Sequence, residues 1–403
     1  MDIVESLRYK DFVWAVEIHR LGLKLMGLWP KNNKFDTNNL WSKLHVGIIL
    51  ILLIFVVNIP MIHAILQVWG DMVLVVNNLR IALPLLIALA KYVIMLWKRK
   101  VLLSIINMMA EDWMALKLNT ERSVMIKQAQ TGRLIMIIGY ISAILAVSIM
   151  IIPSIFGIQM ISERNLTDRH KSLPLAAYHF YDTDRSPQYE LTFCIHTISL
   201  IFTNTIYMFA DIFLIVLVLH ICGQLENFRC RLVNLKSCKS FNIILNNIVT
   251  SYLRMSRFTD NIESTYSIMM LIMMLHFVIV FCLSGFLFTT FLIDRKMDEA
   301  VMSKIYLSIM AITILLMTTF LYCGAGELIS EKCNAVYRAI CDLEWYKWES
   351  KNARNLILLM IRVRHPFRIT AGKIIPLTMA TFCSVLKTST GYISFLLTKH
   401  AKE

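Results

Sequence analysis

Long hydrophobic runs alternate with polar connections along the whole chain. Seven of these runs are long enough to cross a hydrocarbon core of ~30 Å as helices that rise ~1.5 Å per residue. They cover Leu44–Val68, Met72–Trp97, Thr131–Pro153, Thr192–His220, Ile262–Phe288, Val301–Ala325 and Ile374–Leu397. The pattern predicts an all-α protein with seven transmembrane helices.

The polar connections contain further helical patterns. Glu17–Pro30 is amphipathic and too short to span, which predicts a helix lying on the membrane surface. Lys98–Gln130 and Gly223–Asn261 predict that neighbouring spans continue as helices beyond the bilayer. Gly326–Phe367 mixes large apolar residues with charges, so it must be buried either against its own neighbours or against another subunit.

The last span is unusually polar. Thr381, Ser384, Thr388, Gly391, Phe395 and Thr398 recur at spacings of three and four and therefore share one helical face. Hydroxyl groups on one face suit the wall of a pore, with Phe395 as a hydrophobic constriction. The alternative from the pattern alone is a packing face of small residues against another helix. A pore would require several subunits around an axis.

Composition and charge place the chain in a membrane with a defined orientation. The 403 residues are 57% hydrophobic and carry a net charge of +14. Of the 41 lysines and arginines, 28 lie in the amino-terminal segment and the second, fourth and sixth connections, and 8 lie in the other connections and the tail. The positive-inside rule therefore predicts a cytoplasmic amino terminus and an extracellular carboxy terminus. This distribution argues against nucleic acid as the partner.

Two smaller features agree with this orientation. The sequon Asn165-Leu166-Thr167 lies in the third connection, which is predicted to be outside, so Asn165 is a candidate glycosylation site. Nine scattered cysteines show no metal-ligand spacing, and the segment before the first span has no cleavable signal pattern. We expect no metal site and expect the first span to act as its own insertion signal.

Polar residues inside the spans form no catalytic constellation. His196, His276, Asp211 and Glu263 have no nucleophile beside them in the sequence, and each is better interpreted as a satisfied polar residue or a packing contact. We therefore expect no enzymatic activity and no cofactor.

Four of the cations inside the predicted spans would be costly in lipid: Arg80, Lys91, Lys304 and Lys387. Lys91 and Lys304 are expected to extend their amines toward the interface, whereas Arg80 and Lys387 need polar partners.

The outer halves of the helices predict a largely apolar pocket with a few polar groups, suited to a small volatile or lipophilic ligand. Its candidate ligand-binding residues are Val75, Asn78, Leu79, Ile144, Val147, Ile151, Leu200, Asn204, Tyr306 and Met310.

The carboxy-terminal third carries motifs of a known family. They are FLYCGAGELISEKCNAVYRAICDLEWYKW and RNLILLMIRVRHPFRITAGKIIPLTMATFCSVLKTSTGYISFLL, with weaker matches at GLWP, LPLAAYHFYDTDRSPQYELTF and DNIEST. In this order along the chain, they resemble the insect odorant receptors, in a style similar to hymenopteran members. One departure is Thr388–Tyr392, where S-Y-S is commoner in the family, which leaves the details of the pore face open.

The resemblance implies a ligand-tuning subunit rather than the co-receptor, because the long insertion of the co-receptor in the second cytoplasmic loop is absent. It implies a non-selective cation channel, a heterotetramer with the odorant co-receptor (Orco), in the plasma membrane of olfactory sensory neurons. By position, the pore face would include Thr388, Tyr392 and Phe395, with Lys399 at the outer mouth.

These inferences divide the chain into five parts. Residues 1–43 are a cytoplasmic segment, 44–325 carry six spans and the ligand pocket, 326–373 form a cytoplasmic anchor, 374–397 form the pore helix and 398–403 an extracellular tail. A G-protein-coupled-type receptor requires the opposite orientation, a gustatory-like receptor would carry a different closing motif, and a secondary transporter would show repeated halves.

Overall fold

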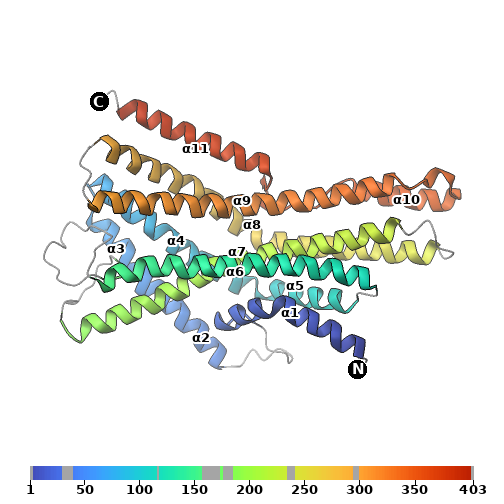
Figure 1. Cartoon of the computed structure of the whole chain (residues 1–403), viewed down its shortest axis with the longest axis horizontal. Helices are drawn as coiled ribbons and strands as arrows, with labels where there is room; N and C mark the ends of the chain where they lie inside the picture. Colours follow the sequence, from blue (N-terminus) through green and yellow to red (C-terminus); the bar gives the residue numbers. More distant parts are fainter. Residues whose placement is uncertain are drawn as a thin grey trace.

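The protein is an elongated bundle of long helices (Figure 1). The computed structural model describes residues 3–29, 40–115, 118–156, 173–175, 185–233, 241–293 and 299–400. Apart from two strands of two residues each, the regular elements of this part of the chain are helical. The predicted all-α class is confirmed.

Each of the seven predicted spans corresponds to helix in the structure. The elements are α2 (Leu40–Ile51), a π-helical stretch η1 (Leu52–Asn58), α3 (Ile59–Gln67), α4 (Met72–Trp97), α6 (Asn119–Ile155), α7 (Gln188–Val233), α8 (Phe241–Ile293), α9 (Glu299–Cys341) and α11 (Met379–His400). Within the residues described, six stretches are long and apolar enough to cross a membrane, the first running through α2, η1 and α3. The side chains of α11, the seventh, are described as far as Tyr392 and at Ser394.

The remaining elements complete one end of the bundle. They are α1 (Ile3–Leu25), α5 (Arg99–Met114), the 3₁₀ turn η3 (Trp345–Lys347), α10 (Ser350–Val363), β1 (Thr370–Ala371) and β2 (Ile375–Pro376). Helices α7, α8 and α9 have 46, 53 and 43 residues, far more than the ~20 that a bilayer requires. They therefore continue as a second, extramembrane layer, as the sequence predicts, and α10 lies at the far end of this layer (Figure 1).

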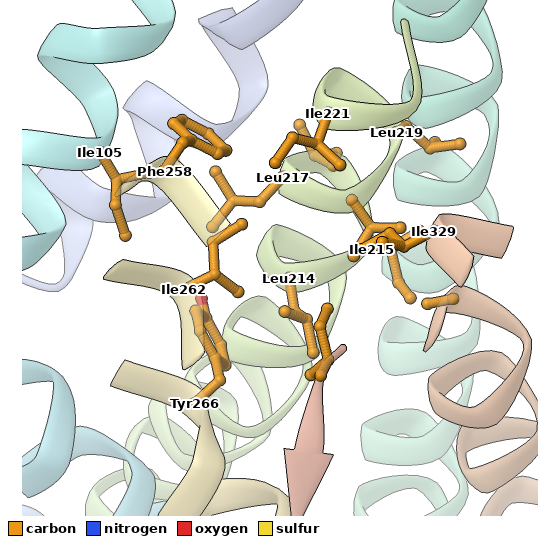
Figure 2. Packing of buried hydrophobic residues seen from close by; sticks show 14 of the residues in the cluster. Ile105, Leu214, Ile215, Leu217, Leu219, Ile221, Phe258, Ile262, Tyr266 and Ile329 are labelled. Atoms are coloured by element: carbon orange, nitrogen blue, oxygen red, sulfur yellow. The ribbon is translucent and has the colours of Figure 1, made fainter. Parts of the chain in front are cut away.

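Helix α7 is the central element of the bundle. Every residue from Phe209 to Gly223 is buried, including both the apolar and the polar positions. A helix that is apolar on all sides must be surrounded by others, and α7 packs against α4, α6, α8 and α9. In Figure 2, Leu217 of α7 lies near Phe258 and Ile262 of α8, and Ile215 lies near Ile329 of α9 on the other side.

The amino-terminal helix α1 differs from the predicted helix on the membrane surface. Instead of lying on the surface, α1 packs against α5, α6 and α7 and buries Phe12, Val16 and Leu23. Gly22 makes the close approach possible, since a Cβ there would come within 2.6 Å of the Phe209 ring. The amphipathic pattern was identified correctly, but its apolar face meets protein.

The segment Gly326–Phe367 was predicted to pack either against its own chain or against another subunit, and the structure decides this for part of it. Ile329, Val336 and Ile340 are almost fully buried within the chain's own bundle, whereas Tyr346 remains 68% exposed. Intramolecular packing therefore accounts for the α9 part of the segment.

The last helix begins later than predicted, at Met379 rather than Ile374. The preceding residues form an antiparallel hairpin in which Thr370 pairs with Pro376 and Ala371 with Ile375. Its turn places Gly372 at φ 64° and Lys373 at φ 60°, a left-handed conformation that a helix cannot contain.

Candidate functional site

A cavity of about 300 Å³ lies among α4, α6, α7, α8 and α9. The segment Leu173–Leu175, between α6 and α7, also contributes to its wall, and Leu175 is buried. The wall is mostly apolar, with Pro84 and Leu85 of α4, Ala146 and Met150 of α6, Met208 of α7, Val280 of α8 and Ile314 and Leu315 of α9. This cavity suits a small apolar molecule.

Several polar groups in the wall are satisfied by backbone oxygens. Asn204 Nδ2 donates to the carbonyl oxygen of Ala143 on α6 at 2.8 Å. The hydroxyls of Ser142 and Thr203 donate to carbonyl oxygens of the preceding turn of their own helices, each at 2.7 Å. These hydrogen bonds stabilise the α6–α7 contact or the residues' own helices, and the hydroxyl protons of Ser142 and Thr203 are not available to a ligand.

Arg80 and His276 are different. The Arg80 guanidinium lines the cavity, is 6% exposed and donates to two neutral acceptors, the hydroxyl of Ser308 on α9 and Asn77 Oδ1 at 3.1 Å. The predicted need of Arg80 for polar partners is thus met. Both ring nitrogens of His276 lack a hydrogen-bond partner in the part of the chain that the structure describes, although its side chain is buried in the wall.

A buried ion pair lies one helical turn below the cavity. Lys91 Nζ is 2.5 Å from Asp211 Oδ1, 3.2 Å from the carbonyl oxygen of Tyr207 and 3.8 Å from the centre of the Tyr207 ring. The Tyr322 hydroxyl approaches the same carboxylate without reaching hydrogen-bond geometry. The prediction that Lys91 extends to the interface is wrong, because a carboxylate on the central helix compensates its charge inside the bundle.

Four of the ten candidate odorant-binding residues come together in this cavity: Val147, Leu200, Asn204 and Met310. Asn78 is fully buried but does not line the cavity, and its amide has no partner among the described residues. Val75, Leu79 and Ile151 are half-buried outside the lining. Ile144 and Tyr306 are 66% and 61% exposed and point away from the cavity.

Sequence reasoning missed Arg80, Tyr207 and His276 as members of the cavity wall. The first and last carried a usable signal, because ionisable residues within a span mark functional sites by default. We interpreted His276 as a satisfied packing residue, whereas both of its ring nitrogens lack a partner in the described structure.

The two faces of α11 separate as the helical pattern predicts. Met379, Phe382 and Leu386 pack, half-buried, on the hydrophobic clusters of the bundle, and α11 contacts α8 and α9. The candidate pore residues Ser384, Thr388, Gly391 and Tyr392 are exposed, and Thr381 is half-buried. A Cβ on Gly391 would meet no atom within 4 Å. Among the described side chains, this polar face is therefore not a packing face against the chain's own helices.

Other predicted positions lie outside the description. The side chains of Phe395, Thr398 and Lys399 and the whole sequon at Asn165 are not among the described residues. No cluster of potential metal ligands occurs in the described ranges, and the eight cysteines there are all free thiols.

A second set of contacts joins the cavity to the base of α11. Ser267 of α8 accepts hydrogen bonds from the hairpin, at its carbonyl oxygen from the Gly372 N–H (2.8 Å) and at its Oγ from the Lys373 N–H (2.9 Å). His276 lies nine residues further along the same helix, about 14 Å away. One rigid helix therefore reaches from the cavity wall to the turn that precedes α11.

Comparison with known proteins agrees with this architecture. A curated relative, odorant receptor 22c of Drosophila melanogaster, is 33% identical over 79 residues, which is 20% of this chain and 19% of the relative's length. The chain is similar in fold to the insect olfactory receptor OR5 of Machilis hrabei, with a TM-score of 0.80, 16% identity and coverage of 95% and 97% of the two chains. The structure of that receptor in complex with eugenol gives a TM-score of 0.75 at 15% identity, covering 97% and 99%.

The family model of the 7tm odorant receptors matches residues 71–390, from the start of α4 into α11. This match contains the residues that line the cavity and, on the polar face of the last helix, Thr381, Ser384 and Thr388. The chain therefore belongs to the 7tm odorant receptor family.

Proposed function

We propose that this chain is the ligand-tuning subunit of an odorant-gated, non-selective cation channel. It would assemble with the odorant co-receptor (Orco) as a heterotetramer in the plasma membrane of olfactory sensory neurons. The observation that carries the proposal is the continuity of α8. This helix contributes His276 and Val280 to the cavity, and its Ser267 accepts a hydrogen bond from the hairpin that precedes the last helix.

The cavity supports a small, mostly apolar ligand. Its volume is at the lower limit of ordinary ligand pockets, about 300–1,000 Å³, so it suits a volatile molecule better than a large lipid. One receptor of similar fold has been solved with eugenol, a molecule of this size class.

Gating follows from differential affinity. A ligand that fits the cavity better when α8 is slightly displaced favours that arrangement, and the contacts of Ser267 with the hairpin would move the base of α11 with it. The close packing of Gly326 on α9 against Leu377 makes the same junction stiff. Motion at the cavity would therefore be transmitted to the last helix rather than absorbed between them.

The exposed polar face of α11 supports a role as pore wall. Ser384, Thr388 and Gly391 project from the bundle without covering protein, a costly arrangement in lipid that would be relieved by water in a shared conduit. Phe395 would narrow this conduit, and Lys399 would lie at its outer mouth.

The far end of the bundle supports assembly with other subunits. On α10, Leu356, Leu359 and Val363 are buried, whereas Leu358 and Ile361 on the opposite side are each 60% exposed. A helix with apolar residues on both sides, in an aqueous compartment, needs a second partner. We assign this outer surface to a contact between subunits.

The test is to record odour-evoked current from cells that express this chain with the co-receptor, each protein alone, and neither. We expect current in the combined cells alone. Tags on both termini of intact cells check the orientation, with the amino terminus inside and the carboxy terminus outside. An internal carboxy terminus would instead favour a G-protein-coupled-type receptor.

A further inference from the structure

We propose that the cavity selects ligands that combine a carboxylate head group with an apolar tail of limited size, and that Arg80 binds the carboxylate. This inference rests on the proposed function, because it assumes that the cavity is the ligand site, and it adds the chemical class of the ligand.

The first argument is the charge of the wall. Arg80 is the one formally charged side chain among the described lining residues, and it contributes a buried guanidinium. Its hydrogen-bond partners, Ser308 and Asn77, are neutral, and it forms no ion pair with a described residue. By contrast, Lys91, about three turns further along α4, is paired with Asp211 at 2.5 Å. The bundle thus neutralises one buried cation and leaves the one in the cavity without an anion.

The second argument is the cost of that arrangement. An ionised group removed from water is strongly unfavourable unless a counter-charge accompanies it. A bound carboxylate would supply this charge, and the planar guanidinium fork matches its two oxygens better than it matches an ester or an alcohol.

The third argument is His276. Its two ring nitrogens are buried in the same wall and have no partner among the described residues. A neutral imidazole offers one donor and one acceptor, so it can donate a hydrogen bond to a polar ligand head. An entirely apolar ligand would leave both nitrogens unsatisfied, which is unfavourable for buried polar groups.

The rest of the cavity wall determines the polarity and size of the ligand's tail. Leu85, Met150, Val280 and Leu315 contribute apolar surface and no hydrogen-bonding side-chain group. At about 30 Å³ for a water-sized group, a cavity of 300 Å³ holds on the order of ten non-hydrogen atoms. This corresponds to a medium-chain acid.

The experiment compares octanoic acid with its isomer methyl heptanoate, which has the same atoms but no ionisable group. Binding to the purified chain together with its co-receptor is measured directly, by isothermal titration in nanodiscs at pH 7, where the acid is ionised. We expect the acid to bind at least tenfold more tightly than the ester. Equal affinities, a tighter ester, or no binding of the acid would overturn the proposal without requiring any variant.

Variants of Arg80 then test whether this residue causes the preference for the acid over the ester. Arg80→Gln should remove the preference for the acid and leave ester binding within about threefold, and Arg80→Lys should retain part of the preference because it keeps the charge. If Arg80→Gln does not fold, Arg80→Lys provides the test: an unchanged acid-to-ester ratio in it would overturn the bidentate role of Arg80.

Current recordings separate this inference from the proposed function. If the complex conducts in response to neutral odorants and ignores octanoic acid, the channel function stands and the ligand class is wrong. If octanoic acid binds with the expected preference and no ligand evokes current, the ligand class stands and the channel function is wrong.

Discussion

Glu263 on α8 accepts a hydrogen bond of 2.9 Å from the backbone N–H of Thr370, and its other carboxylate oxygen accepts one from the Thr370 hydroxyl. One carboxylate thus ties the strand before the last helix to the helix that lines the cavity. If this contact transmits ligand binding, then Glu263→Ala should weaken gating rather than binding. Hydrogen bonds to charged groups contribute about 1.5–3 kcal/mol, so we expect at least a tenfold rise in the ligand concentration for half-maximal current.

The measurement is a dose–response series of current alongside ligand binding to the same variant. Glu349→Ala is a matched control, because this glutamate is exposed and its side chain does not cap α10. A parallel loss of binding affinity in Glu263→Ala would show that the residue shapes the cavity instead of coupling it.

Gly326 and Gly324 on α9 form a natural pair of test and control. A Cβ at position 326 would overlap the carbonyl oxygen of Leu377, whereas one at position 324 would meet no atom within 4 Å. Gly326→Ala should therefore displace the base of α11 and lower the thermal stability of the purified protein, by about 1–3 kcal/mol. Gly324→Ala should be neutral or slightly stabilising, since alanine favours helix by up to about 1 kcal/mol. Similar melting temperatures for the two variants would contradict the close approach of α9 to Leu377.

The ion pair of Lys91 and Asp211 should behave as a unit. Removing one partner leaves an isolated buried charge, so Lys91→Met and Asp211→Leu should each destabilise the fold by roughly 3–5 kcal/mol. The double variant should recover much of this loss, because neither charge remains. Thermal unfolding in detergent of the two single variants and the double variant measures these changes in stability. Lys347 forms an exposed pair with Glu344, so Lys347→Met is a control whose stability should change little. Additive losses in the double variant would show that the two residues do not compensate each other.

His19 on α1 should make the docking of this helix sensitive to acid. Its ring contacts Phe209 and Phe213 edge-on, and burial lowers its pKa to about 3 from the ordinary value of 6.5. Between these two values the unfolded chain binds the proton more readily than the folded chain, so stability is fully present above pH 6.5 and falls as the pH decreases toward 3. The expected loss is about tenfold in the folding equilibrium per pH unit.

Protease protection of α1 measured from pH 7.5 to pH 5 tests this expectation. His19→Phe should flatten the profile, whereas His365→Phe, at an exposed position, should leave it as in the unmodified protein. A profile for His19→Phe that follows the unmodified protein would assign the acid sensitivity to other groups.

The hydrophobic pattern predicted the spans well because bilayer length is a strong constraint. Met72–Trp97 has the same bounds in sequence and structure, and four other predicted spans fall within the longer helices α6, α7, α8 and α9. Helix extensions were predictable for a similar reason, since apolar positions at three- and four-residue spacing continue past the bilayer. The start of α11 was not predictable from the pattern. The left-handed turn at Gly372 and Lys373 that precedes it depends on hydrogen bonds to Ser267, 105 or more positions away in the chain.

The cavity was less predictable than the spans. Periodicity shows that Val147, Leu200, Asn204 and Met310 lie on faces of their helices, but it does not give the rotation of each helix about its axis. Ile144 lies three residues before Val147 and nonetheless points outward. In the same way, the sequence showed that Lys91 was costly, but its pairing with Asp211 depends on how α4 meets α7.

The central claim is that this chain contributes the wall of an odorant-gated pore, and cysteine modification at Thr388 tests it most directly. Cells would express the co-receptor with this chain carrying Thr388→Cys in a Cys383→Ser background, since Cys383 is itself exposed on α11. Leu386→Cys, on the packed face, is the matched control. We predict that a cationic thiol reagent applied during odour stimulation reduces the evoked current for Thr388→Cys and not for Leu386→Cys. Undiminished current after demonstrated labelling of Thr388→Cys would contradict the pore assignment.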